Sequence, residues 1–495
     1  MRQEQSDAGA HPAGGGDAGQ LWAGVAKVDI TRTDAGPAHD PLYVKALVLR
    51  DDATTAVLVT VDAVAIAEIG WIENTYLADV RSRLQAELNI APAHVLITAS
   101  HCHGKVCADV AQRTIQAVTE AWRGMVSVDV GVGRGREDRI MENRRLTLKS
   151  GKEADVRHAY ALPPDDEVVG VGPVDPQIGI LRLDRKDGPT LAVVYNFACH
   201  PIQGVPSGGN TADIAGFASG VIEDALGDGA VALFLQGCAG DVNPAWYKDV
   251  DHPRDAEPLG NMLGLSAVRA LKTIRSGPGG ALRVINETLA LPRADLAPRV
   301  DALRAEQARL LASLKGTSLN LKTFLALTVK YRLSPDFPSS DSHRYLHERM
   351  LGREELKAHD EHNRASIRRY VENIHIMEEL TRVQENMALL EKHRARNEAA
   401  GERTIAVEVV GMRIGEFVLV TFPGELSVQI GLGIKERSPH RFTFVAGYTN
   451  GYLYYTPTEE QLRNVGGAQE DSDCLVAPGW QALYEAKAAE LLQRL

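Results

Sequence analysis

The sequence predicts an α/β protein in which a mixed β-sheet core is layered with helices and interrupted by an inserted helical arm. Two observations support this class. Short β-branched apolar runs, typical of buried strands, alternate with helical stretches in residues 21–290 and resume in 402–495. Between these regions, apolar residues recur at helical spacing over nearly a hundred positions. Alternating strands and helices favour a sheet covered by helices.

The elements follow in order along the first region. Residues 25–30, 44–49 and 56–61 are predicted strands, a helical stretch follows at 71–88, and a further strand leads into His101. The pattern then repeats with a strand at 191–197, a helix at 217–226, a strand at 231–236 and a helix after Pro258. Strands resume at 405–410 and 417–421, and the last is at 442–445. No solenoid-type repeat is visible.

The predicted arm covers residues 291–401. Its apolar residues recur at helical spacing in two groups, with a polar stretch around 334–342 between them. These groups are Leu296, Val300, Leu303, Leu310 and Leu314, and then Ile367, Tyr370, Ile374, Met377, Leu380, Val383, Met387 and Leu390. Such helices would pack on the body or on another subunit, or would merely cover the sheet. Residues 1–20, rich in Gly, Ala, Asp and Gln, are predicted to be a disordered leader.

Composition narrows the class of protein. Of 495 residues, 44% are hydrophobic and 24% charged, which is ordinary for a soluble globular chain. The net charge of −11 argues against a nucleic-acid partner and against stable association with an anionic membrane. No run approaches the ~18–20 apolar residues that span a bilayer. The five cysteines are odd in number and scattered, which does not suggest a disulfide framework. Because the N-terminus also lacks the apolar core of a signal peptide, we expect a cytoplasmic location.

Four short islands place reactive side chains where predicted strands end. They are residues 94–104 with His101 and His103, residues 196–201 with His200, residues 422–425 with Glu425, and residues 450–455. Side chains just past strand ends can converge at one edge of a sheet. Two histidines and a carboxylate are sufficient to hold a catalytic Zn²⁺ with an open position for water. The pattern therefore predicts a zinc site at the strand ends.

Each island also has a purely structural explanation. His101 and His103 lie two apart in a predicted strand, so their side chains would share one face and that of Cys102 would point to the other. The two histidines could instead be a hydrogen-bonded structural pair. His200 could be a core histidine, and Glu425, opening a probable helix, could serve first-turn electrostatics. The loop at 236–244, with glycines around Asp241, permits close backbone approach to a ligand or is a plain strand exit. Asp213 could equally cap a helix.

Taken in order, these islands resemble the neutral/alkaline ceramidase family of zinc amidohydrolases. The similarity runs from residues 24–31, Gly-Val-Ala-Lys-Val-Asp-Ile-Thr, to residues 456–460, Thr-Pro-Thr-Glu-Glu, and omits only the helical arm. The resemblance implies a mixed α/β assembly with zinc at its centre. It implies that His101, His200, Glu425 and Tyr455 are the zinc ligands, with Tyr452 as the alternative to Tyr455. His103 and Arg144 match positions that line the site and help bind the reacting carbonyl.

Two departures from this family change the expected substrate. Where the ceramidases have serine in a Gly-Asp-Val-Ser-Pro run, this sequence has Asn243, which cannot act as a hydroxyl nucleophile. The family's lipid-handling members carry a further β-sandwich domain, whereas this sequence ends at Leu495. Together with the lack of a secretion signal, these differences argue against ceramide and favour a small soluble substrate.

The expected function is therefore a zinc-dependent hydrolase that cleaves an amide bond of a small soluble substrate through a metal-activated water. In this prediction Asp241 or Asp213 shuttles the proton, and Asn243 donates a hydrogen bond where relatives use an alcohol. One alternative is a zinc-dependent esterase or lactonase. Another is a non-catalytic, metal-stabilised binding protein. The expected partners are a small-molecule substrate and, through the arm, further copies of the chain.

Overall fold

The computed structural model describes residues 20–495 except 157–161, 205–208, 248, 250, 339–341 and 465–466. The predicted disordered leader therefore lies, apart from Gln20, outside the described residues. All five cysteines are free. Among the described residues, none of the helices combines the length and the apolar character needed to cross a bilayer.

The body is organised around a nine-stranded mixed sheet in the order β12-β11-β10-β5-β1-β2-β3-β4, with β14 also paired to β5. Most neighbours are antiparallel, but β3 with β4 and β11 with β12 are parallel. The strands are β1 (Trp22–Asp29), β2 (Tyr43–Arg50), β3 (Thr55–Val61), β4 (Val95–Ala99), β5 (Val126–Arg136), β10 (Gln177–Arg185), β11 (Thr190–Phe197), β12 (Val231–Gln236) and β14 (Gly277–Pro278).

A second sheet packs face to face on the first. Its order is β15-β16-β17-β19, formed by Leu282–Pro292, Thr404–Ile414, Phe417–Thr421 and Phe442–Ala446. One apolar cluster joins the sheets, with Leu47 and Leu58 from the first and Met412 and Phe444 from the second. These side chains alternate along their strands with others that face the helices, as expected of strands buried on both faces.

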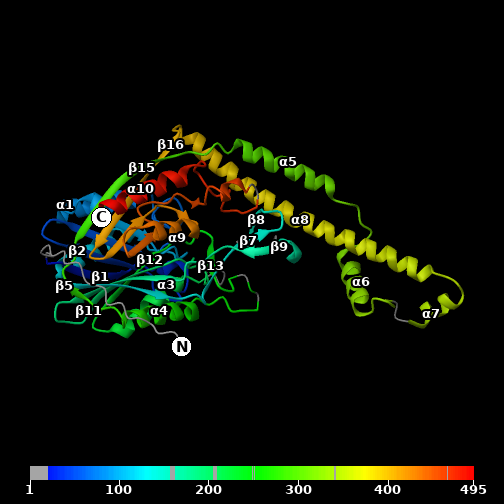
Figure 1. The fold of residues 1–495 in the computed structure, drawn as a ribbon, viewed down its shortest axis with the longest axis horizontal. Coiled ribbons are helices and arrows are strands. Elements are labelled where there is room, and N and C mark those ends of the chain that lie inside the picture. Colours follow the sequence, from blue (N-terminus) through cyan, green and yellow to red (C-terminus); the bar gives the residue numbers. More distant parts are fainter. Residues whose placement is uncertain are drawn as a thin grey trace, which may run out of the picture.

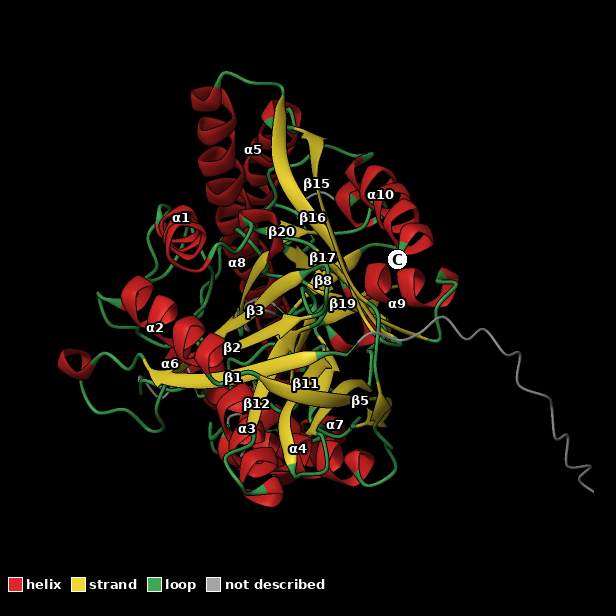
Figure 2. Cartoon of the chain, turned by 90° about the vertical axis from the view of Figure 1, so that its left-hand side faces the viewer, coloured by secondary structure: helices red, strands yellow, loops and turns green. Residues whose placement is uncertain are grey.

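Helices cover both outer faces, so the body has four layers (Figure 2). α1 (Tyr76–Leu88), α2 (Val110–Arg123), α3 (Asp213–Leu226) and α4 (Glu257–Leu271) pack on the large sheet. α9 (Val428–Arg437) and α10 (Trp480–Arg494) pack on the small sheet. This arrangement confirms the predicted fold class, a mixed sheet core layered with helices.

The predicted helical arm is also confirmed. It comprises α5 (Ala297–Ser313), α6 (Leu321–Leu333), α7 (Ser342–Met350) and α8 (Glu355–Ala400), and it extends far beyond the body (Figure 1). At 1.5 Å per residue, the 46 residues of α8 span about 69 Å. α5 packs along the body-proximal half of α8 through a small apolar cluster that includes Val300, Leu303 and Val383. The division into domains at 290/291 and 401/402 remains a prediction.

Several predicted boundaries need correction. The helix predicted at 71–88 begins at Tyr76, and the one predicted at 217–226 begins at Asp213. Glu425 does not open a helix, because it lies in a two-residue strand and α9 begins at Val428. The short strands that surround the site were not predicted: β6 (Met141–Asn143), β7 (Arg145–Leu148), β8 (Glu153–Asp155), β9 (Val168–Val171), β13 (Val242–Pro244), β18 (Glu425–Leu426) and β20 (Tyr455–Thr456).

Candidate metal centre

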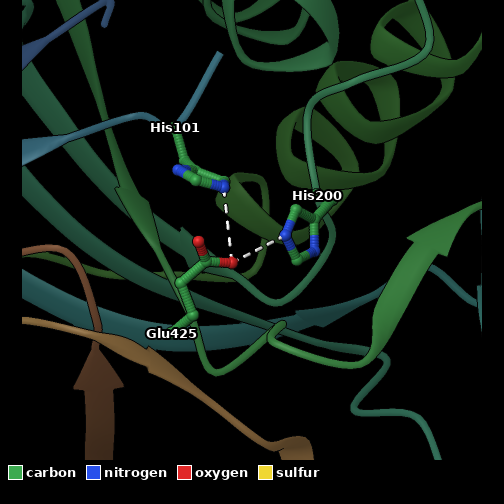
Figure 3. Close-up of side chains that lie close together, drawn as sticks. All are labelled: His101, His200 and Glu425. Atoms are coloured by element: carbon green, nitrogen blue, oxygen red, sulfur yellow. Dashed lines mark hydrogen bonds and ion pairs between the residues drawn. The ribbon is translucent and has the colours of Figure 1, made fainter. Parts of the chain in front are cut away.

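Three side chains from distant parts of the chain meet in the centre of the body. The Oε2 atom of Glu425 lies 3.0 Å from Nε2 of His200 and 3.5 Å from Nε2 of His101 (Figure 3). One potential ligand atom from each residue lies within 4.8 Å of the other two, and each residue is 2% exposed. Two imidazoles and a carboxylate at this spacing form a group that could hold a metal ion.

The ends of strands position these residues. His200 follows β11, and Glu425 begins β18, which pairs in parallel with β20 so that Glu425 is opposite Tyr455. His101 lies beyond β4, which ends at Ala99, and has a φ of 68°, which L-residues seldom adopt. The prediction that His101 and His103 share a strand face is therefore wrong, because both residues lie beyond the end of the strand.

Backbone carbonyls orient both imidazoles. Nδ1 of His101 lies 2.6 Å from the carbonyl oxygen of Val64, and Nδ1 of His200 lies 3.1 Å from that of Val242. A carbonyl can only accept, so each Nδ1 carries the proton and donates it. The unprotonated Nε2 atoms are then left to face Glu425. This is the outer-shell arrangement that fixes the tautomer of metal-binding histidines.

Electrostatic interactions favour the protonation states that metal binding would require. Burial opposes ionisation of Glu425, but its close contacts with His101 and then with His200 hold the pKa of this carboxyl well below its usual range. Burial and the positive charge of Arg144 lower the pKa of His200 to about 4, which keeps this imidazole neutral near pH 7. Burial, followed by the charge of Glu425, raises the pKa of Tyr448 and of Tyr452 well above the ordinary value. Both phenols therefore stay protonated and donate to Glu425, with Tyr448 Oη 3.2 Å from Oε2 and Tyr452 bonded to Oε1.

The group opens onto a cavity of about 300 Å³. Six residues predicted from the sequence line it: His101, His103, Arg144, His200, Glu425 and Tyr455. The other described residues of its wall are Val64, Ile69, Ile202, Tyr247, Lys392, Tyr452, Tyr454 and Asp473. A partly apolar wall with a few convergent polar groups is typical of a small-molecule site.

Arg144 and His103 have different surroundings. His103 is exposed, and its ring lies 5.6 Å from that of His101. Arg144 is 1% exposed and is held on several sides. Its guanidinium donates to Glu470 at 2.5 Å, to Oδ1 of Asn243 at 2.8 Å and to the phenol oxygen of Tyr455 at 3.1 Å. Arg144 therefore connects the Asn243 loop to Tyr455 at the cavity wall.

The two predicted proton shuttles already accept hydrogen bonds from the protein. Asp241 accepts from the backbone N–H of Val428 at 2.8 Å and from the amide of Asn143 at 3.2 Å. The Asp213 carboxylate accepts from the backbone N–H groups of residues 203, 204 and 214. Burial raises the pKa of Asp213 to about 6 against these hydrogen bonds. Neither aspartate is among the described residues that line the cavity.

Sequence reasoning missed several residues of the site. Tyr448, Glu470, Lys392 and Asp473 were not predicted, and Tyr452 was named only as an alternative ligand. The run Glu-Asp-Ser-Asp at 470–473 was a usable signal in the sequence, and the structure buries all four residues. Burial raises the pKa of Glu470 to about 7, against the attraction of Arg144 and Arg145. Lys392 carried no such signal, because nothing in the sequence distinguishes it from the other charged residues of a predicted helix.

Fold and site together define a four-layered α/β protein with a candidate centre of two histidines and one glutamate at strand ends. No family model and no curated protein matches the chain. Among solved structures it is similar to neutral ceramidase from Pseudomonas aeruginosa, with a TM-score of 0.59, 16% identity, and coverage of 97% of this chain and 75% of that one. It is also similar to a ceramidase complexed with C2, with a TM-score of 0.59, 18% identity, and coverage of 96% and 76%. The resemblance predicted from the sequence is thus confirmed for the fold.

Proposed function

We propose that the protein is a zinc-dependent hydrolase that cleaves an amide bond of a small soluble substrate through a metal-activated water. One observation carries the proposal: His101, His200 and Glu425 bring three potential ligand atoms within 4.8 Å of one another at the wall of a cavity. Their arrangement on a ceramidase-like fold supports hydrolysis of an acyl bond as the chemistry.

The residues present suit Zn²⁺. Zinc prefers imidazole nitrogen and carboxylate oxygen, usually with four ligands, and both imidazoles already present an unprotonated Nε2. Tyr455 is the proposed fourth ligand, because its phenol oxygen accepts from Arg144 while that of Tyr452 donates to Glu425. Bound zinc lowers the pKa of water toward neutrality and polarises a carbonyl.

The chain's own groups bind the substrate and move protons. We assign His103, which is exposed in the cavity, to hydrogen-bond the reacting carbonyl. Arg144 supports this region by holding Tyr455 and Asn243 in place. Asp241 and Asp213 remain the predicted shuttles for the leaving amine. However, their oxygens already accept hydrogen bonds from the protein, which favours His103 for that step too.

Two other functions fit the same site. An ester or lactone would use the same groups, because both reactions are acyl transfers to water. Comparing kcat/KM for an amide and an ester with the same acyl group would separate the two. A non-catalytic, metal-stabilised binding protein is the second alternative. It is favoured if the zinc-loaded protein hydrolyses nothing in a broad screen of amides and esters.

Metal content and activity of His200→Ala test the main proposal. His94→Ala is the matched control, because its Nδ1 also lies 3.0 Å from a backbone carbonyl, that of Thr55, and His94 does not line the cavity. We expect one equivalent of zinc in the wild type and in His94→Ala, and loss of zinc and of amide hydrolysis in His200→Ala. Zinc retained in His200→Ala at wild-type level would contradict the proposal.

Two further features of the protein are proposed. The odd set of five cysteines supports a cytoplasmic location. The arm supports homo-oligomerisation, because α6 exposes apolar residues at four-residue intervals. They are Leu321, Leu325, Val329 and Leu333, which are 54–80% exposed. A row of apolar side chains at this spacing is typical of a helix that packs against another helix.

A further inference from the structure

The arm contributes a residue to the cavity. Lys392, on α8, lines the cavity that contains His101, His200 and Glu425. It lies on the exposed side of the helix, with its ammonium 5.0 Å from the ring centre of Tyr454, another cavity residue. A cation over an aromatic face at this distance is attracted to it. The lysine is thereby held at the rim of the cavity.

Buried contacts fix the position of α8 against the body next to this lysine. His393 lies 2.6 Å from Asp473, and the Asn386 amide oxygen accepts from the Ser472 hydroxyl at 2.5 Å. One turn before Asn386, the Arg382 guanidinium donates to the Gly467 carbonyl at 2.8 Å. Because these partners belong to the loop before α10, α8 and the cavity wall form one packed unit.

The ammonium group of Lys392 forms no ion pair with a described residue. Among the described residues it has neither a hydrogen bond nor an ion pair, whereas the neighbouring cations have both. Arg396, which also lies 5.0 Å from the ring centre of Tyr454, is 2.7 Å from Glu68, and Arg144 lies 2.5 Å from Glu470. The internal stretches outside the described residues contain a single acidic residue, Asp341, which lies between α6 and α7 in the chain.

We propose that Lys392 binds a carboxylate of the substrate, so that the protein acts on amides carrying an acidic group on the part that faces the cavity mouth. The inference deepens the proposed hydrolase function and rests on it. An exposed lysine that forms no ion pair with any described carboxylate keeps its attraction for an anionic ligand. A cavity of about 300 Å³ is large enough for a small amide of this kind.

Matched substrates test this assignment. One pair is the N-succinyl and the neutral N-succinamoyl anilide, with the acid on the acyl side. The other is N-acetylglycine and N-acetylglycinamide, with the acid on the amine side. We expect kcat/KM for the acidic member of one pair to exceed that of its neutral partner about fivefold, the upper end of the effect of one exposed ion pair. Added salt should reduce the preference, because the lysine is exposed.

Variants show whether Lys392 is responsible. Lys392→Ala should abolish the preference, and Lys392→Glu should reverse it. Lys322→Ala, an exposed lysine on α6, is the control for losing one charge from the arm and should keep the preference. An equal rate on both members of each pair, or a preference unaffected by Lys392→Ala, would overturn the inference.

A binding measurement separates this inference from the proposed function. Calorimetry with succinate reports the carboxylate site without turnover. If no amide is hydrolysed but succinate binds to the wild type and not to Lys392→Ala, the anion site stands and the hydrolase proposal fails. If amides are hydrolysed without preference and succinate binds equally well to the wild type and to Lys392→Ala, the hydrolase proposal is supported and the anion site is refuted.

Discussion

The body and the arm use similar apolar sequence patterns with opposite results. In the body, apolar side chains of both sheets and of six helices are buried in three large clusters. In the arm, one small cluster holds α5 to the proximal half of α8, and α6 exposes its row of apolar side chains. Periodicity therefore predicts that a segment is helical, but it does not reveal whether anything covers the apolar face.

The arm itself has two dissimilar halves. The half of α8 nearest the body is part of the cavity wall, and its polar residues Arg382, Asn386 and His393 are buried against the loop at 467–475. The far half carries α6 and α7 and does not approach the sheets (Figure 1). The comparison predicts that substitutions of buried residues in the near half affect stability and the site, whereas those of exposed residues in the far half affect neither.

The largest effect on stability is expected at the joint between the two regions. His393 is fully buried, and His393→Ala leaves Asp473 without this partner. Removing a hydrogen-bond partner from a buried carboxylate costs about 3 kcal/mol, so the free energy of unfolding should fall by about this amount in urea titrations. His375→Ala, at an exposed pair with Glu378 on the same helix, should change it by less than about 0.5 kcal/mol. Equal losses would mean that the two halves of α8 do not differ.

A smaller effect is expected inside the site. Tyr452→Phe removes the hydroxyl that donates to Glu425 but keeps the ring. Loss of an outer-shell hydrogen bond typically weakens metal binding 10- to 100-fold, or about 1.4–2.7 kcal/mol, which competition with a zinc chelator would measure. Tyr76→Phe removes a buried hydroxyl that bonds Thr114 between α1 and α2, and should leave zinc affinity unchanged. An unchanged affinity in Tyr452→Phe would argue against Glu425 as a ligand.

The smallest effect on stability is expected at the far end of the arm. Leu325→Asp combined with Val329→Asp changes two exposed side chains of α6, so the free energy of unfolding should stay within about 0.5 kcal/mol. If α6 mediates self-association, the molar mass from light scattering should fall to that of one chain. Lys330→Asp on the same helix is the control for added negative charge. A wild type that is already monomeric would refute the oligomer proposal.

Much of the fold could be predicted because its strands are short, apolar and β-branched. The strands containing 44–49, 56–61 and 231–236 are all present. The candidate metal group was predicted because His101, His200 and Glu425 each follow or end such a strand. The local backbone geometry of the site could not be predicted. The positive φ of His101 and the pairing of β18 with β20, which places Glu425 opposite Tyr455, depend on contacts between segments far apart in the chain.

The remaining residues of the site could not be found from local sequence. Lys392 reaches the cavity only because α8 packs on the loop at 467–475, a tertiary contact that helical periodicity does not encode. The oxygens that orient the imidazoles belong to the backbone of Val64 and Val242, whose side chains carry no signal for that role. Asp213 and Asp241 were chosen for their chemistry, but their carboxylates accept hydrogen bonds from the protein instead.

The separation of the three proposed ligands along the chain has a consequence for biogenesis. His200 and Glu425 are 225 positions apart, and they meet only when both sheets have formed and stacked. An unfolded polypeptide pays a large loop-closure entropy to hold such groups together, so an ion cannot serve as a nucleus for folding as it does in zinc fingers. The ion would be acquired last, by an already assembled scaffold, and it would stabilise only that native state.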